Sequence, residues 1–202
     1  MSCVLWKVCL AAAAAVVVSA PIAAAEPESL PPHEKTFPSP FGSFTVGSRD
    51  ETVNRIPPLN MMGTTREALV GNVTYGRIDG PAGGKLKTGY HVGCAVAIGA
   101  GNVGVMPDLE TGIEGAQTPI PHALVDPGLV ATVNLTPGEV KELAVAEKEL
   151  IPGKDVQIVT RDFHIVVNAC SGPVTIRQFT YLYAKSAEVD DSGAVFGEST
   201  WL

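Results

Sequence analysis

The sequence lacks the signatures of common catalytic and metal sites. Neither H-E-x-x-H nor G-x-S-x-G occurs, and the four histidines, His33, His91, His122 and His164, are scattered along the chain. Without a ligand spacing or a nucleophile motif, a hydrolase or zinc site has no support. His91 and His164 lie in alternating runs, where a histidine is more often packed or at the surface than bound to metal. The sequence predicts no enzyme activity, no metal and no cofactor.

The chain also has little that could cross a membrane as a helix. The apolar run of residues 10–25 contains Ser19 and Pro21 and is shorter than the roughly 20 apolar residues that span a bilayer. It follows a weakly basic start at Lys7 and ends in small residues. These features predict a signal peptide over residues 1–25, cleaved after Ala25, and therefore an exported protein. The alternative is a membrane anchor.

Basic residues are few. The chain has 14 Lys and Arg against 21 Asp and Glu, a formal net charge of −7. Cleavage of the signal peptide would remove Lys7 and no acid, and the net charge would then be about −8. A phosphate backbone attracts basic proteins, so nucleic acid is not an expected partner.

Cysteine is scarce as well. Of the four cysteines, Cys3 and Cys9 lie in the predicted signal peptide, which leaves Cys94 and Cys170. An even number in an oxidising compartment predicts that the two pair. Closing a loop of this length stabilises the fold by about 4 kcal/mol in the simple chain-entropy model. The alternative is two unpaired buried thiols.

Residues 26–40 have little apolar content and include five prolines. Such a segment can bury little surface, so we predict a mobile Pro-rich leader outside the fold. The remaining residues, 41–202, suit a single domain.

Short runs rich in β-branched and aromatic residues, separated by Gly, Pro and Asn, fill this domain. The predicted strands cover residues 43–46, 68–78, 85–98, 130–135, 156–167, 174–184 and 194–196. This spacing predicts an all-β fold, an antiparallel β-sandwich. The apolar alternation changes phase between Ile158 and Phe163, which predicts a β-bulge near Arg161.

Several stretches share their order and spacing with one known family. They are residues 50–60 (DETVNRIPPLN), 65–68 (TREA), 86–94 (LKTGYHVGC), 136–140 (TPGEV), 147–150 (EKEL), 170–177 (CSGPVTIR) and 195–198 (VFGE). Together they resemble the MspA family, the secreted goblet-shaped porins of mycobacteria and their mycolic-acid-bearing relatives, in a short, cysteine-containing form. His91 departs from the usual Gln of that family.

The resemblance implies a β-sandwich rim from each subunit, a homo-oligomeric ring, taken as an octamer, and a β-hairpin from each subunit that joins a shared membrane barrel. It also implies the bridge between Cys94 and Cys170. The implied function is an outer-membrane porin of a mycolic-acid-bearing actinobacterium, in contact with envelope lipid, for small hydrophilic solutes or cations. The alternative is a secreted monomeric β-sandwich that shares the fold and forms no channel.

Residues 141–150 give opposing signals. They are rich in helix formers and follow a capping-box pattern at 136–139, which favours a helix. Val140, Leu143 and Val145 also fit a strand when neighbouring strands are in place. We expect a strand, because the resemblance outweighs local propensity.

The segment 88–140 contains no Lys or Arg across 53 residues. Within it, residues 95–101 are small, apolar and uncharged, and we predict that they begin a stem hairpin spanning about residues 95–133. The descending strand would lie within residues 120–133. Four prolines interrupt the segment, namely Pro107, Pro119, Pro121 and Pro127.

Residues 107–115 have the turn formers and carboxylates expected at a hairpin tip. In a ring of identical subunits, Asp108, Glu110 and Glu114 would repeat around one axis, where they would attract cations and repel anions. We therefore predict that they lie at the pore constriction and give cation preference. The alternative is a solvated surface loop, the common interpretation of three clustered acids.

Overall fold

The computed structural model of the chain describes residues 26–96, 104–105, 108–114, 120–126, 130–135 and 138–202. Within them the protein is all-β, with thirteen strands and no helix, so the predicted fold class is confirmed. None of these residues belongs to a helix long and apolar enough for a membrane span.

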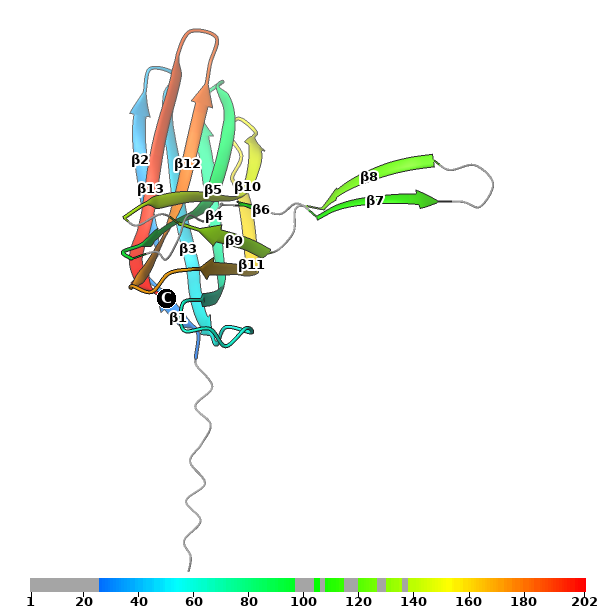
Figure 1. Ribbon diagram of the computed structural model, residues 1–202. Helices are drawn as coiled ribbons and strands as arrows, with labels where there is room; N and C mark the ends of the chain where they lie inside the picture. Colours follow the sequence, from blue (N-terminus) through cyan, green and yellow to red (C-terminus); the bar gives the residue numbers. More distant parts are fainter. Residues whose placement is uncertain (1–25, 97–103, 106–107, 115–119, 127–129, 136–137) are drawn as a thin grey trace, which may run out of the picture.

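Two sheets pack face to face as a sandwich (Figure 1). The larger sheet has the order β1-β3-β4-β11-β9-β6, with β2 also paired to β3: β1 (Glu28–Leu30), β2 (His33–Ser39), β3 (Gly42–Ile56), β4 (Arg66–Asp79), β11 (Val156–Asn168), β9 (Val130–Asn134) and β6 (Gly104–Val105). The smaller sheet has the order β10-β5-β12-β13: β10 (Val140–Leu150), β5 (Gly83–Cys94), β12 (Val174–Lys185) and β13 (Asp190–Trp201). β7 (Asp108–Glu114) and β8 (Ile120–Asp126) form a separate two-stranded ladder.

The core between the sheets has two apolar clusters and a polar belt between them. One cluster contains Tyr90, Val92 and both cysteines, and the other is built around Phe44, Ile78 and Leu182. The belt consists of the buried residues Ser48, Glu51, Asn72, Thr74, Thr88, Gln178 and Thr180. Hydrogen bonds of these groups, such as Asn72 Nδ2 to Tyr90 Oη at 3.0 Å and Gln178 Nε2 to Thr180 Oγ1 at 2.7 Å, offset part of the cost of burying them. Four buried atoms of the belt have no hydrogen-bond partner among the described residues: Ser48 Oγ, Glu51 Oε2, Asn72 Oδ1 and Gln178 Oε1.

The predicted bulge near Arg161 is confirmed. The β4–β11 register shifts between Thr160 and Phe163, and Asp162 has a φ of 49°. A second bulge that the sequence did not reveal shifts the β3–β4 register between Arg49 and Thr52. Each extra residue lets the strand keep its apolar side toward the core on both sides of the bulge.

The prediction of a mobile leader over residues 26–40 is wrong, because β1 and β2 lie in this segment. They pair one after the other with the same edge of β3, and Pro31 and Pro32 fall in the gap between them. An edge strand tolerates proline, since the missing N–H leaves no ladder bond unmade on its open side. Leu30 and Phe37 pack against the core and contribute the burial that the composition had concealed.

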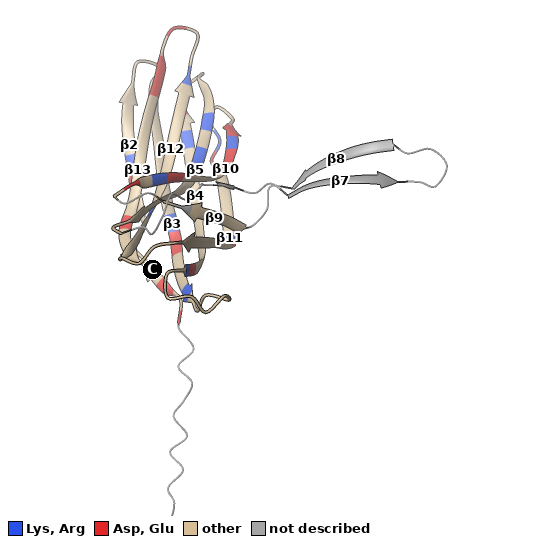
Figure 2. Cartoon of the chain, viewed as in Figure 1, with Lys and Arg blue, Asp and Glu red and all other residues tan. Residues whose placement is uncertain are grey.

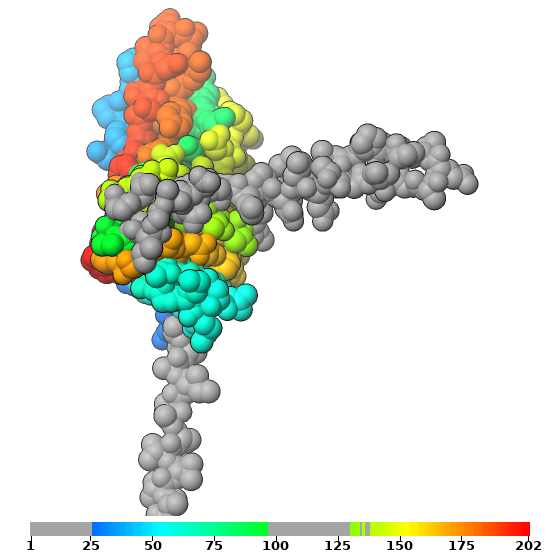
Figure 3. Space-filling view, viewed as in Figure 1, coloured from blue at the N-terminus to red at the C-terminus, as the bar shows by residue number. Residues whose placement is uncertain are grey.

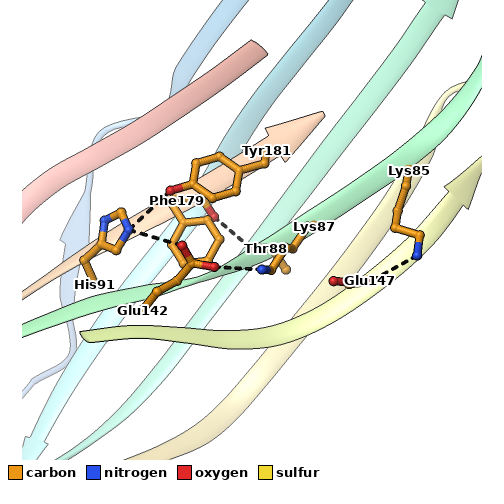
Figure 4. Close-up of polar contacts among 8 residues, drawn as sticks. All are labelled: Lys85, Lys87, Thr88, His91, Glu142, Glu147, Phe179 and Tyr181. Atoms are coloured by element: carbon orange, nitrogen blue, oxygen red, sulfur yellow. Dashed lines mark hydrogen bonds and ion pairs between the residues drawn. The ribbon is translucent and has the colours of Figure 1, made fainter. Parts of the chain in front are cut away.

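The prediction that residues 141–150 are extended is confirmed by β10. Its Leu143 and Leu150 are buried, and burial of a leucine side chain contributes about 2 kcal/mol. On the outer face, Lys87 Nζ lies 2.7 Å from Glu142 Oε1 and Lys85 Nζ lies 3.2 Å from Glu147 Oε2 (Figure 4). Such exposed pairs each add at most about 1 kcal/mol, so core burial is the main reason that this segment is a strand.

Candidate pore hairpin and its anchor

A disulfide closes the sandwich where the chain leaves β5. Cys94, the last residue of β5, is bonded to Cys170, and the two Cα atoms are 6.1 Å apart. The predicted pairing is therefore confirmed. Both cysteines are buried in the cluster that also holds Val92 and Val174. The bond ties the start of the insertion to the segment between β11 and β12.

Backbone hydrogen bonds hold the next two residues. The Val96 carbonyl accepts from Ser171 N at 2.9 Å and from Gly172 N at 3.2 Å, and Ala95 N donates to the Pro173 carbonyl at 3.2 Å. A Cβ at Gly172 would lie 2.8 Å from Val96 N, so this approach requires glycine. The chain thus leaves the sandwich at a fixed point.

The prediction of a strand over residues 95–101 is not supported at its start. β5 ends at Cys94, and Ala95 and Val96 form a bend. The hydrogen bonds from Ser171 and Gly172 explain this, because they turn the chain away from the β5 direction. Residues 97–101 lie outside the described part of the chain.

The returning leg is anchored in the same half of the core. β9 runs parallel to β11, with Val130 opposite His164 and Asn134 opposite Asn168. Ala131 and Val133 of this strand are buried in the cluster that contains the disulfide. Both ends of the insertion are therefore fixed by one packed cluster.

The acids Asp108, Glu110 and Glu114 lie in a strand. β7 pairs with β8 in one antiparallel ladder that runs from Asp108 opposite Asp126 to Glu114 opposite Ile120. The prediction of a turn over residues 107–115 is therefore wrong for the residues 108–114. Their alternation of acids with Leu109, Thr111 and Ile113 is the period of a strand, and it outweighs the turn preference of Gly112.

The register places the charged residues on one face of this ladder. Successive strand residues alternate between faces, so those at 108, 110, 112 and 114 share a face with their partners at 126, 124, 122 and 120. This face carries Asp108, Glu110, Glu114, Asp126 and His122, together with the apolar Ile120 and Leu124. The opposite face carries Leu109, Thr111, Ile113, Pro121, Ala123 and Val125, none of them charged. Asp126 and His122 were missed as candidates, and only the pairing register reveals them.

Two histidines predicted to be packed or at the surface are packed. The His91 ring stacks on Phe179 with a centroid distance of 4.9 Å, and its Nε2 is 3.3 Å from Tyr181 Oη (Figure 4). Burial, together with the Arg177 guanidinium, lowers the pKa of His91. His164 Nε2 donates to Glu67 Oε2 at 2.9 Å. Among the residues that the structure describes, no group of three or more His, Cys, Asp or Glu could hold a metal ion.

The sandwich, its disulfide-closed anchor and the ladder with acids on one face define a class: an all-β domain carrying an amphipathic hairpin insertion. The sequence model of the MspA family matches residues 42–200, and the chain belongs to that family. A search among curated proteins found no match.

Family membership gives the general function. MspA-family proteins are porins, which are channel proteins and not enzymes, and they form oligomeric assemblies. The family is typical of the mycobacterial outer membrane. The described fold agrees with this assignment, because its insertion is a β-hairpin and not a helix.

Proposed function

We propose that several copies of this chain assemble into a cation-preferring pore for small hydrophilic solutes, whose barrel is built from the β7–β8 hairpins. The observation that carries the proposal is the register of this ladder, which separates four acids and His122 from an uncharged face. β7 alternates as strands of membrane barrels do, with apolar residues toward lipid and polar residues toward water. β8 adds Asp126 and His122 to the charged face, but it also places Ile120 and Leu124 there.

The acids explain the preferred sign of the ion. In a closed ring, Asp108, Glu110 and Glu114 of every subunit repeat around the axis. Their field is strong because a narrow pore with low-dielectric walls screens charge poorly. No Lys or Arg lies between residues 88 and 140, so no lysine or arginine of the insertion opposes this field.

Export agrees with the disulfide. A bond between buried cysteines persists in an oxidising compartment, which the predicted signal peptide over residues 1–25 would provide. Residues 1–25 lie outside the described part of the chain. The proposed location is the outer envelope of a mycolic-acid-bearing bacterium.

One observation favours the alternative, a secreted monomeric sandwich without a channel. Each strand of the described ladder has seven residues, whereas a tilted membrane strand uses about 9 to 11. A barrel therefore needs further paired residues next to β7 and β8.

Conductance in planar lipid bilayers tests the proposal. Purified wild-type protein should give discrete steps, with reversal potentials under a salt gradient that indicate cation preference. The triple variant Asp108→Asn/Glu110→Gln/Glu114→Gln should conduct with weaker cation preference, and adding Asp126→Asn should weaken it further.

The matched control neutralises three acids at the far end of the sandwich, Glu188→Gln/Asp190→Asn/Asp191→Asn, and should leave the reversal potential unchanged. Oligomer formation in detergent is measured for every variant, so that lost assembly is distinguished from lost selectivity. Unchanged selectivity in the triple variant would exclude these acids from the pore. Absence of channels from wild-type protein would favour the monomeric sandwich.

A further inference from the structure

Exposed apolar side chains gather at one end of the sandwich. Of the eleven large hydrophobic residues exposed in the described part of the chain, six form what we call the apolar tip: Leu59, Met61, Met62, Val96, Val140 and Trp201. Leu59 is 92% exposed, Met61 85% and Trp201 61%. A soluble surface seldom gathers large apolar groups in this way, and such a patch marks a surface that contacts something else.

The loop that carries three of these residues is held in one shape. Met61 N donates to the Pro58 carbonyl at 2.9 Å, and Met62 N donates to Asn60 Oδ1 at 3.0 Å. Leu59 N donates to Glu67 Oε1 at 3.0 Å. The loop therefore presents Leu59, Met61 and Met62 to the outside from a fixed backbone, which lowers the entropy that docking would cost.

The apolar tip lies at the end of the sandwich where the hairpin insertion leaves. Cys170 N donates to the Thr64 carbonyl at 2.9 Å, and Cys170 is bonded to Cys94. Val140 is paired with Gly93, next to Cys94, and Trp201 is paired with Thr175. Figure 3 shows the loop in cyan at the lower end of the molecule, the end at which Figure 1 places the C-terminus.

One cation at this end lies beside the uncharged loop. Residues 56–65 carry no charge and are drawn tan in Figure 2, and Arg55 and Arg66 flank them. Arg55 is ion-paired with Glu28 at 2.6 Å, so Arg66 is the flanking cation that suits an anionic surface. The Arg66 guanidinium is fixed beside the loop, because its Nη1 donates to the carbonyls of Gly63 at 2.6 Å and Thr65 at 2.9 Å. The neighbouring Glu67 is buried and is engaged by His164 and Leu59 N.

We propose that the apolar tip docks on the lipid surface beside the pore. Leucine and methionine insert among acyl chains, tryptophan favours the membrane–water interface, and arginine pairs with anionic headgroups. The inference rests on the proposed pore, because a hairpin that enters a bilayer brings the end of the sandwich from which it emerges close to the lipid. The tip then fixes the height of each sandwich above the membrane.

Quenching of Trp201 by brominated lipid tests this contact directly. Trp201 is the only tryptophan of residues 26–202, because Trp6 lies in the predicted signal peptide. The cleaved chain, residues 26–202, is mixed with vesicles of phosphatidylglycerol and phosphatidylcholine brominated on its acyl chains. We expect strong quenching relative to unbrominated vesicles. The variant Leu59→Ser/Met61→Ser/Met62→Ser should lower vesicle affinity at least about tenfold.

The matched control removes exposed apolar residues elsewhere, Ile151→Ser/Val159→Ser, and should bind vesicles like wild type. If brominated lipid quenches Trp201 but the protein forms no channels, docking is supported and the pore is rejected. If the protein forms channels but Trp201 is not quenched, the docking proposal is overturned and the pore proposal is unaffected. Loss of the detergent oligomer in the tip variant, with vesicle affinity unchanged, would make the tip a contact between subunits and would also overturn the inference.

Discussion

Glu51 should make the stability of the sandwich depend on pH. Its side chain is 2% exposed, and Oε2 has no hydrogen-bond partner among the described residues. Burial and the nearby Glu198 carboxylate raise the pKa of Glu51 from 4.5 to about 7. The group faces β13, since a Cβ at Gly197 would lie 2.5 Å from Glu51 Oε2.

The sign and size of the effect follow from this difference in pKa. Below pH 4.5 the Glu51 carboxyl is protonated in both the folded and the unfolded chain. The contribution of the protonated carboxyl to the free energy of unfolding is then fully present. Between pH 4.5 and about 7 the unfolded chain has lost the proton that the folded chain retains, and stability falls as the pH rises. Above about pH 7 the loss is complete and amounts to about 3 kcal/mol.

Glu51→Gln removes this dependence because the amide has nearly the same shape and does not ionise. The free energy of unfolding in urea should match that of wild type within about 1 kcal/mol at pH 4.5, and should exceed it by about 2–3 kcal/mol at pH 8. Every other ionisable group is common to the two proteins, so the difference between them isolates Glu51. Glu198→Gln leaves Glu51 in place, so at pH 8 it should raise the free energy of unfolding by less than Glu51→Gln does. If the free energy of unfolding changed with pH in the same way for wild type and Glu51→Gln from pH 4.5 to 8, the reasoning would be refuted.

Three further predictions concern the anchor and the core. Reduction of the Cys94–Cys170 bond should lower the free energy of unfolding by about 3–4 kcal/mol, and a thiol assay that finds two free cysteines in the untreated protein would contradict the pairing. Gly172→Val should displace Val96, and faster hydrogen exchange at the amides of Ser171 and residue 172 would show it, whereas unchanged exchange would mean that the close approach is unnecessary. Leu143→Ala should cost about 2–4 kcal/mol in urea unfolding by leaving a cavity, while Val140→Ala on the exposed face should cost less than about 1 kcal/mol.

The parts of the fold that the sequence predicted are those where burial follows a simple period. Residues 174–184 alternate so strongly that β12 was expected almost to its ends, and a change of phase gave the bulge near Arg161. β10 was predicted from the resemblance to the MspA family and against its helical propensity, and the burial of Leu143 and Leu150 between the two sheets explains why the propensity did not prevail.

The errors arose where partners distant in the sequence decide the structure. Residues 26–40 looked unable to fold because their composition does not reveal that β3 offers them an open edge. The acids at 108, 110 and 114 were assigned to a turn because glycine and proline were weighted above the alternation around them. Glu51 gave no signal, since an acidic residue in a strand is usually solvated, and only the packing of β13 against β3 buries it.

Both legs of the hairpin insertion are fixed in the same half of the core. The departing leg is fixed at Cys94, and the returning leg is fixed by Ala131 and Val133, all in the same apolar cluster. The polar belt with Glu51 separates this cluster from the other half of the core, so ionisation of Glu51 acts at the boundary of the anchor. A pore selects ions only if every subunit turns the same face of its hairpin toward the axis, because one reversed hairpin would place carboxylates against lipid. In the proposed pore, selectivity would therefore depend on the disulfide, the Val96 hydrogen bonds and the buried β9 strand as well as on the acids, since these contacts fix where both legs of the hairpin leave the sandwich.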